Sequence, residues 1–327
     1  MRRWIRRLAV ALLLFAAFVY LNNSALLAPV GREPLTLLAH RGLHQTFGHE
    51  DLKADTCTAA RIRPPVHTFL ENTLPSMEAA FRLGADVVEF DIHPTTDGQF
   101  AVFHDWTLDC RTNGTGVTRQ HSLAELKALD IAYGYTVDGR TFPFRGKGAG
   151  QMPSLDEVLA RFPDKRFLIH VKGNDPAEGD RLVARLAQLP PDRLAMLMVY
   201  GGERPVTRVA ERLPTVRTMT GHRLKSCLKT YLGLGWSGLV PAACRNSVVL
   251  VPVNYAHWLW GWPDRFLDRM RRAGTEVFVV GPWAGEDFSR GIDDADEFGQ
   301  LPKRFTGGVW TNRIELIAPL ARARASR

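Results

Sequence analysis

Eight short apolar runs restrict the fold of this chain more than any other feature. They span Thr36–Gly42, Val87–Pro94, Phe167–Gly173, Leu194–Tyr200, Val216–Thr220, Ser247–Tyr255, Glu276–Trp283 and Gly307–Asn312. Several are apolar nearly throughout, as expected for strands that are covered on both faces. Helix-like segments lie between most of them, at Ser76–Leu83, Gly179–Gln188, Val206–Leu213, Asp264–Ala273 and Ile314–Ala323. This alternation predicts an α/β fold, a single (β/α)8 TIM barrel, and 327 residues with 45% hydrophobic side chains can fill its core.

Polar side chains stand at or near the ends of several predicted strands. His40 and Arg41 close the first strand, His170 and Lys172 the third, and Asn312 the last. In a (β/α)8 barrel the C-terminal ends of the strands converge on one face, and that face carries the active site. Residues that are far apart in the sequence are therefore expected to become neighbours.

The second predicted strand carries Glu89 and Asp91 two positions apart, so that both carboxylates point to the same side. A polar turn and a short apolar run then lead to His104. Paired carboxylates suit a divalent cation, and a nearby histidine suits proton transfer at neutral pH. The alternative is a half-buried strand with two solvent-facing acids and a surface histidine, because a motif this short is weak on its own.

The ordered set of motifs resembles the glycerophosphodiester phosphodiesterase family. The marks of that family are His-Arg-Gly, Glu-Asn-Thr, Gly-Ala-Asp-x-x-Glu-x-Asp and His-Asp. Here they are read at His40–Gly42, Glu71–Thr73, Gly84–Asp91 and His104–Asp105. The resemblance runs from about Leu37 to Glu315 and implies the same barrel fold.

The resemblance implies roles for the residues. His40 and His104 match the acid and base histidines of the family, and Glu89 and Asp91 match its metal ligands, with Glu71 close by. Charge neutralisation on a phosphate also needs cations, which Arg41 and Lys172 can supply. The family is thought to use the glycerol hydroxyl of the substrate as the nucleophile, giving a cyclic phosphate that water then opens. The implied cofactor is one divalent metal ion.

Two positions depart from the family pattern. His170-Val171-Lys172 stands where the family has Glu-x-Lys, so an imidazole replaces an expected carboxylate ligand. If His170 binds the metal, the site favours Mn, Fe, Co or Zn over Ca or Mg; alternatively, His170 is not a ligand. Near the C-terminus, Thr311-Asn312-Arg313-Ile314 stands where Thr-Asp-x-Pro is common.

Long insertions interrupt the alternation of strands and helices. Leu43–Leu70 emerges beside His40 and is expected to form a lid or wall over the site, and Asp105–Pro153 is a second insertion with a helix expected at Leu123–Leu129. The region Tyr231–Asn246, together with the later tryptophans 258, 260 and 262, could rest against lipid; the alternative is ordinary aromatic packing.

The N-terminus predicts a membrane anchor. Met1–Arg7 contains four arginines and Leu8–Leu21 is almost wholly apolar. We expect an uncleaved single-pass segment over residues 1–30 rather than a removed signal peptide, and a barrel over residues 31–327. The arginines would hold the N-terminus in the cytoplasm, which places the catalytic domain on the outer, periplasmic side of the cytoplasmic membrane.

Charge and cysteine content bear on partners and compartment. A net charge of +8 suits anionic lipid headgroups or phosphate substrates, and no motif points to nucleic acid or to an obligate protein partner. The four cysteines show no zinc-site spacing and can oxidise outside the cell, with a bridge expected between Cys227 and Cys244. The alternative is four small buried side chains.

The leading functional hypothesis is metal-dependent hydrolysis, in lipid metabolism, of glycerophosphodiesters or lysophospholipid-like phosphodiesters to an alcohol and glycerol phosphate. The alternative enzyme is a phospholipase-D-like lyase that leaves a cyclic phosphate. A hypothesis from another class is a catalytically inactive, membrane-tethered phospholipid-binding module, which the substitution at His170 motivates.

Overall fold

The computed structural model describes residues 2–28, 34–48, 51–53, 56–285 and 290–326. Eight parallel strands form the sheet in the order β6-β5-β4-β2-β1-β9-β8-β7. They are β1 (Thr36–His40), β2 (Val87–Pro94), β4 (Arg166–Val171), β5 (Leu197–Gly201), β6 (Arg217–Thr220), β7 (Val248–Pro252), β8 (Glu276–Val280) and β9 (Gly308–Thr311). A parallel bridge between Thr218 and Ser247 joins β6 to β7, so the sheet curves round into the predicted TIM barrel.

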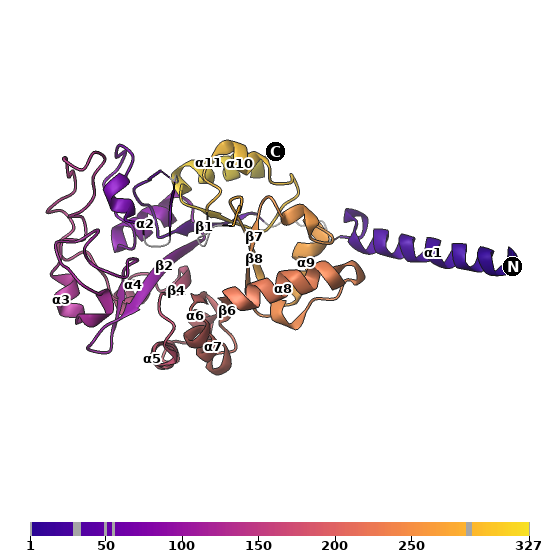
Figure 1. Cartoon of the computed structure of the whole chain (residues 1–327), viewed down its shortest axis with the longest axis horizontal. Helices are drawn as coiled ribbons and strands as arrows, with labels where there is room; N and C mark the ends of the chain where they lie inside the picture. The colour runs from indigo at the N-terminus through magenta and orange to yellow at the C-terminus, as the bar shows by residue number, and fades with distance from the viewer. Residues whose placement is uncertain (1, 29–33, 49–50, 54–55, 286–289, 327) are drawn as a thin grey trace.

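Helices cover the outside of the barrel (Figure 1). They are α2 (Leu74–Leu83), α4 (Leu155–Arg161), α5 (Pro176–Leu186), α6 (Pro191–Ala195), α7 (Glu203–Arg212), α8 (Gly221–Leu234), α9 (Asp264–Arg272), α10 (Ala295–Gly299) and α11 (Ile314–Ala325). All eight predicted strands and the five predicted helices are confirmed, but the fourth strand begins three residues later than expected. Pro191 starts the short helix α6 there, because proline is well suited to the first turn of a helix.

The sequence analysis missed α8. Its apolar side chains Leu224, Cys227, Leu228 and Tyr231 follow helical spacing, and Thr220 caps its first turn by accepting a hydrogen bond from the backbone of Arg223. Glycines at both ends of this helix obscured the pattern.

Alternate side chains along each strand point to opposite faces of the sheet. Leu38, Leu168 and Phe278 belong to a cluster inside the barrel, whereas their neighbours Leu37 and Ile169 pack against the helices. Six polar residues near the ends of the strands lie an even number of positions after an interior residue, so they point to the same face. They are His40, Glu89, Asp91, His170, Tyr200 and Asn312. These six side chains therefore form the last layer of the barrel interior.

Both cysteine pairs are bridged. The expected Cys227–Cys244 disulfide is confirmed and ties the middle of α8 to the segment before β7. A second disulfide, Cys57–Cys110, joins the two insertions to each other. The short strand β3 (Phe100–Val102) pairs antiparallel with β2, and α3 (Leu123–Lys127) is the helix expected in the second insertion.

The N-terminal helix α1 (Arg2–Asn23) projects away from the barrel (Figure 1). It has 22 residues, of which none is buried, and an 18-residue stretch within it has a mean hydropathy of 1.9, so it is long and apolar enough to cross a membrane. The predicted domain boundary after residue 30 lies outside the described residues.

Candidate active site

The turn after β1 has a backbone that few residues can adopt. Arg41 and Gly42 have φ angles of 58° and 78°. A Cβ atom on Gly42 would lie 2.6 Å from the hydroxyl oxygen of Ser76, so only glycine fits. The left-handed conformation of Arg41 turns its backbone N–H toward Glu89, which accepts a hydrogen bond of 3.2 Å. The His-Arg-Gly motif thus brings its own side chains over the carboxylates of β2.

The hydrogen bonds of His40 define its tautomer. Nε of Arg41 can only donate, and it lies 3.2 Å from Nε2 of His40, so Nε2 carries the lone pair. Nδ1 then carries the proton and donates it to the side-chain oxygen of Asn312 at 2.6 Å. Burial and the charge of Arg41 lower the pKa of His40 well below its usual value, which keeps the ring neutral. The same Nε2 lies 3.7 Å from Glu89.

The two carboxylates of β2 are fully buried, and their pKa values are shifted in opposite directions. Burial and the neighbouring Asp91 raise the pKa of Glu89 to about 8. Burial would also raise the pKa of Asp91, but Lys172, His104 and Arg41 outweigh it and hold that pKa well below its ordinary range. Tyr200 donates a hydrogen bond of 2.7 Å to the second oxygen of Glu89.

Strand register adds His170 to this pair. Asp91 lies opposite His170 on β4, which in turn lies opposite Tyr200 on β5. Nδ1 of His170 is 2.8 Å from Asp91, and its ring stacks on Tyr200 with 4.2 Å between the ring centroids. Burial lowers the pKa of His170 to about 4, so the imidazole is neutral, the form that binds metals.

Glu89, Asp91 and His170 each present one ligand atom, and these atoms lie within 4.8 Å of one another. A neutral imidazole with two crowded carboxylates fits a divalent cation, since bound positive charge would relieve the repulsion that raises the pKa of Glu89. The nitrogen ligand favours a borderline transition metal.

Glu71, the fourth ligand expected from the sequence, is not brought into this group. Its two carboxylate oxygens face arginines instead, at 3.1 Å from Arg41 and 2.9 Å from Arg111. Burial opposes ionisation of Glu71, but Arg111 and Arg41 lower its pKa below the usual value. Glu71 therefore lies in position to hold Arg41 toward the site.

The next two residues of the Glu-Asn-Thr motif support the framework. Asn72, at a φ of 58°, donates to Asp91 at 3.0 Å and accepts from the backbone N–H of Asp91 at 3.1 Å. Thr73 caps the first turn of α2. The motif thereby fixes the carboxylate of Asp91 and the start of helix α2.

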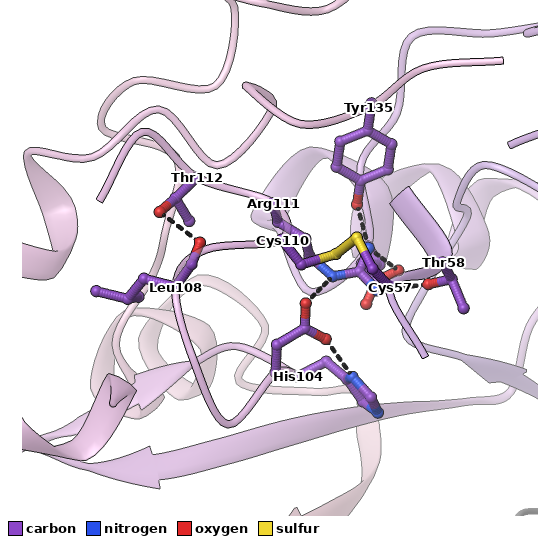
Figure 2. Close-up of a disulfide and its surroundings, with 10 residues drawn as sticks. Cys57, Thr58, His104, Leu108, Cys110, Arg111, Thr112 and Tyr135 are labelled. Atoms are coloured by element: carbon purple, nitrogen blue, oxygen red, sulfur yellow. Dashed lines mark hydrogen bonds and ion pairs between the residues drawn. A yellow bond between two sulfur atoms is a disulfide. The ribbon is translucent and has the colours of Figure 1, made fainter. Parts of the chain in front are cut away.

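His104 is positioned by two charged residues, Asp105 and Arg111, that are linked by hydrogen bonds (Figure 2). Nδ1 of His104 lies 2.7 Å from Asp105, whose other oxygen accepts a hydrogen bond of 2.8 Å from Arg111. Burial and Arg41 lower the pKa of His104, while Asp105 opposes that shift. Nε2 is the ring nitrogen that remains for a substrate.

Arg111 is fixed by both insertions. It donates to Tyr135 at 2.8 Å and to Thr58 at 2.7 Å, and it is only 2% exposed. Thr58 and Arg111 each directly follow a cysteine of the Cys57–Cys110 disulfide, which Figure 2 shows beside them. The disulfide thus lies next to the residue that orders Asp105 and His104.

Two cations face the carboxylates. Nε of Arg41 lies 3.5 Å, and Nζ of Lys172 3.6 Å, from Asp91. Their side chains retain 12% and 11% exposure, so a substrate can reach them. His93, two residues after Asp91 on β2, is buried, with Nε2 3.3 Å from the carbonyl oxygen of His104.

The sequence analysis missed several supporting residues. Arg111 lies six residues after the His-Asp motif in an insertion whose path was not predicted, and Tyr200 ends a strand without any motif. Asp293 was missed as well; it accepts hydrogen bonds from the backbone and side chain of Asn312, at 2.6 and 2.7 Å. The position of Tyr200 at the C-terminal end of an expected barrel strand was the one available signal.

Comparison with known proteins agrees with this arrangement. Residues 40–190 match the model of the glycerophosphoryl diester phosphodiesterase family. A glycerophosphodiester phosphodiesterase of Caldanaerobacter subterraneus is 38% identical over 103 residues, and one of Bacillus subtilis is 35% identical over 122 residues. These matches cover 31% and 36% of this chain, but only 39% and 41% of the length of those relatives.

The fold comparison extends over the whole barrel. The crystal structure of glycerophosphodiester phosphodiesterase from Agrobacterium tumefaciens matches with a TM-score of 0.57 and 22% identity, covering 88% of this chain and 99% of that one. The family match contains His40, Glu89, Asp91, His104 and His170. Residues 40–190 of this chain are thus similar to the glycerophosphoryl diester phosphodiesterase family, and the barrel shares the fold of the Agrobacterium tumefaciens structure.

Proposed function

We propose that this protein is a metal-dependent phosphodiesterase that hydrolyses glycerophosphodiesters, or lysophospholipid-like phosphodiesters, to an alcohol and glycerol phosphate. One observation carries the proposal. Two histidines, each with an ordered Nδ1 partner, lie beside a buried carboxylate pair and the two cations Arg41 and Lys172. Acid and base groups beside a site for an anion are what cleavage of a phosphodiester requires.

The metal would be held by Glu89, Asp91 and His170, with Glu71 assigned to Arg41 rather than to the metal. When bound, it supplies positive charge that polarises the phosphoryl oxygens. Arg41 and Lys172 bind the same anion, the first as a planar fork and the second as a point charge.

The two histidines differ in the group that forms a hydrogen bond with Nδ1. His40 faces a neutral amide through Nδ1, which stabilises an imidazolium less than a carboxylate would. Burial and Arg41 lower its pKa, which suits the role of base toward the attacking hydroxyl. His104 faces the carboxylate of Asp105, which stabilises an imidazolium and suits the acid that protonates the leaving alkoxide. A bound phosphate anion would further favour the charged form of His104.

An internal glycerol hydroxyl is the nucleophile that the family resemblance implies, with water opening the cyclic phosphate afterwards. A lyase would stop at the cyclic phosphate. The ordered histidines and cations argue against an inactive binding module, since phospholipid binding alone would not need either proton carrier.

The test is a panel of glycerophosphodiesters and lysophospholipids, assayed after chelation and again with each divalent metal added. Phosphorus NMR of the products separates glycerol phosphate from a cyclic phosphate. Restored turnover with glycerol phosphate as the product supports the proposal. Binding of substrates without turnover under every metal would support the binding module instead.

We also propose that α1 anchors the barrel at the outer face of the cytoplasmic membrane. The arginines that precede its apolar stretch support an N-terminus inside the cell. The two disulfides support an oxidising compartment for the barrel.

A further inference from the structure

The end of α1 is joined to the barrel by a polar joint. The side-chain amides of Asn22 and Asn23 both donate to the backbone oxygen of Trp236, at 3.1 and 2.9 Å. From α9, Arg269 donates to the Asn22 carbonyl at 2.8 Å and to the Asn23 side chain at 3.0 Å, and Arg265 donates to the same carbonyl at 3.0 Å. Carbonyls at a helix C-terminus lack intrahelical partners, so these arginines complete α1. The helix therefore leaves the barrel in a fixed position.

Apolar side chains surround this joint without protein cover. Leu232, Leu234, Leu239 and Trp260 are 44%, 46%, 63% and 36% exposed, respectively. With Trp236 they form a surface that we name the shoulder. Trp236 contacts Phe15 of α1, with 5.3 Å between the ring centroids, so the shoulder is continuous with the apolar surface of α1.

The shoulder is held firmly by its polar groups. The indole N–H of Trp260 donates to the carbonyl of Leu232 at 2.9 Å, and Tyr231 donates to the carbonyl of Trp260 at 2.9 Å. These bonds tie the loop after β7 to the last turn of α8. The side chains are thus presented outward by an ordered framework, and a contiguous exposed apolar patch marks an interaction surface.

We propose that the shoulder is a second membrane contact, buried at the boundary between headgroups and acyl chains beside the span formed by α1. The inference rests on α1 lying in a bilayer and is independent of the proposed reaction. Tryptophan is favoured at that boundary, and Lys225 and Lys229 on the exposed surface of α8 can face anionic headgroups. A bilayer is favoured over a second copy of the chain because Phe15 of α1 contacts Trp236, so lipid that surrounds α1 would also reach the shoulder.

The position of the shoulder has a consequence for the active site. Figure 1 shows α1 and the end of α8 at one end of the long axis, and α3 with the second insertion at the other. The second insertion begins directly after His104, so both would stand away from the bilayer. Contact through the shoulder would hold the barrel in that orientation, whereas an attachment through α1 alone would let the barrel reorient relative to the membrane.

The test uses the full chain in lipid nanodiscs of phosphatidylcholine and phosphatidylglycerol. A photoactivatable diazirine amino acid replaces Leu239 or, as a matched exposed control in the first insertion, Val66, which is 84% exposed. We expect lipid adducts at position 239 at least tenfold more abundant than at position 66. Equal adduct levels, or protein–protein adducts at position 239, would overturn the proposal.

A conservative pair of variants provides a second readout that does not depend on labelling. Trp260→Phe and the control Trp106→Phe, from the second insertion, are compared in discs with and without brominated acyl chains. The emission lost on replacing Trp260 should be quenched by bromine, whereas the emission lost on replacing Trp106 should not. Emission from Trp260 that is as bright in brominated as in plain lipid would contradict the shoulder assignment.

Discussion

The side-chain oxygen of Asn312 accepts the Nδ1 proton of His40 at 2.6 Å, and its amide nitrogen donates to Asp293 at 2.7 Å. The carboxylate of Asp293 therefore does not contact His40 directly, because the neutral amide of Asn312 lies between them. An amide cannot take up a proton or neutralise an imidazolium, so His40 keeps its lone pair on Nε2. This relation explains how an asparagine can stand where the family commonly has aspartate.

Exchanging the two groups should move the pH profile. In the double variant Asn312→Asp/Asp293→Asn the total charge is unchanged, but the carboxylate now faces His40 and raises its pKa by about 1 unit or more. Because the neutral form is the proposed base, the acidic limb of kcat/KM should shift to higher pH. Asp293→Asn alone is the control and should not raise that limb. The same limb in wild type and double variant would remove His40 as the base.

Arg111 should act on catalysis through His104. Arg111→Lys loses the fork that joins Asp105 to Glu71, and a misplaced His104 should lower kcat by about 10- to 100-fold while KM changes little. The control is Arg145→Lys, on the exposed part of the same insertion. Circular dichroism checks that both variants are folded. Equal kcat values for the two variants would contradict a positioning role.

The two disulfides should differ in their effect on activity. Either bridge is expected to contribute about 2–4 kcal/mol to the free energy of unfolding. Only Cys57–Cys110 lies beside Arg111, so Cys57→Ser/Cys110→Ser should lower kcat as well as the melting temperature. Cys227→Ser/Cys244→Ser should lower the melting temperature and leave kcat within about twofold of wild type. Equal losses of kcat would mean that both bridges act only through stability.

The sequence predicted the barrel well because strands buried on both faces leave long apolar runs. It predicted His40, Glu89 and Asp91 as neighbours because strand parity and strand ends follow from local pattern. It did not predict that the carboxylate oxygens of Glu71, which follows a loop, contact Arg41 and Arg111, since nothing local in the sequence indicates those contacts. The supporting residues Arg111 and Asp293 lie in long connections whose return path depends on tertiary contacts.

His170 should decide which metal is preferred. If it is a ligand with Glu89 and Asp91, His170→Glu should shift the preference from a borderline transition metal toward Ca²⁺ or Mg²⁺. His170→Ala should weaken metal binding without unfolding the barrel, because Tyr200 remains to cover Glu89. Metal titrations followed by calorimetry measure both effects. Unchanged affinity and unchanged metal order in both variants would place His170 outside the metal site.

The division of labour between His40 and His104 can be measured by changing the leaving group. An alcohol leaving group needs a proton from the acid, whereas p-nitrophenolate leaves readily without one. His40→Ala and His104→Ala should each lower kcat on a glycerophosphodiester with an alkyl alcohol by about 10²–10⁴-fold.

The most direct measurement of this account is therefore kcat for both variants and wild type on alkyl and p-nitrophenyl esters of glycerol phosphate. We predict that His104→Ala regains most of its activity on the p-nitrophenyl ester, while His40→Ala stays impaired on both esters. Near-normal turnover of the alkyl ester by either variant would remove that histidine from the mechanism, and rescue of His40→Ala instead would reverse the assigned roles.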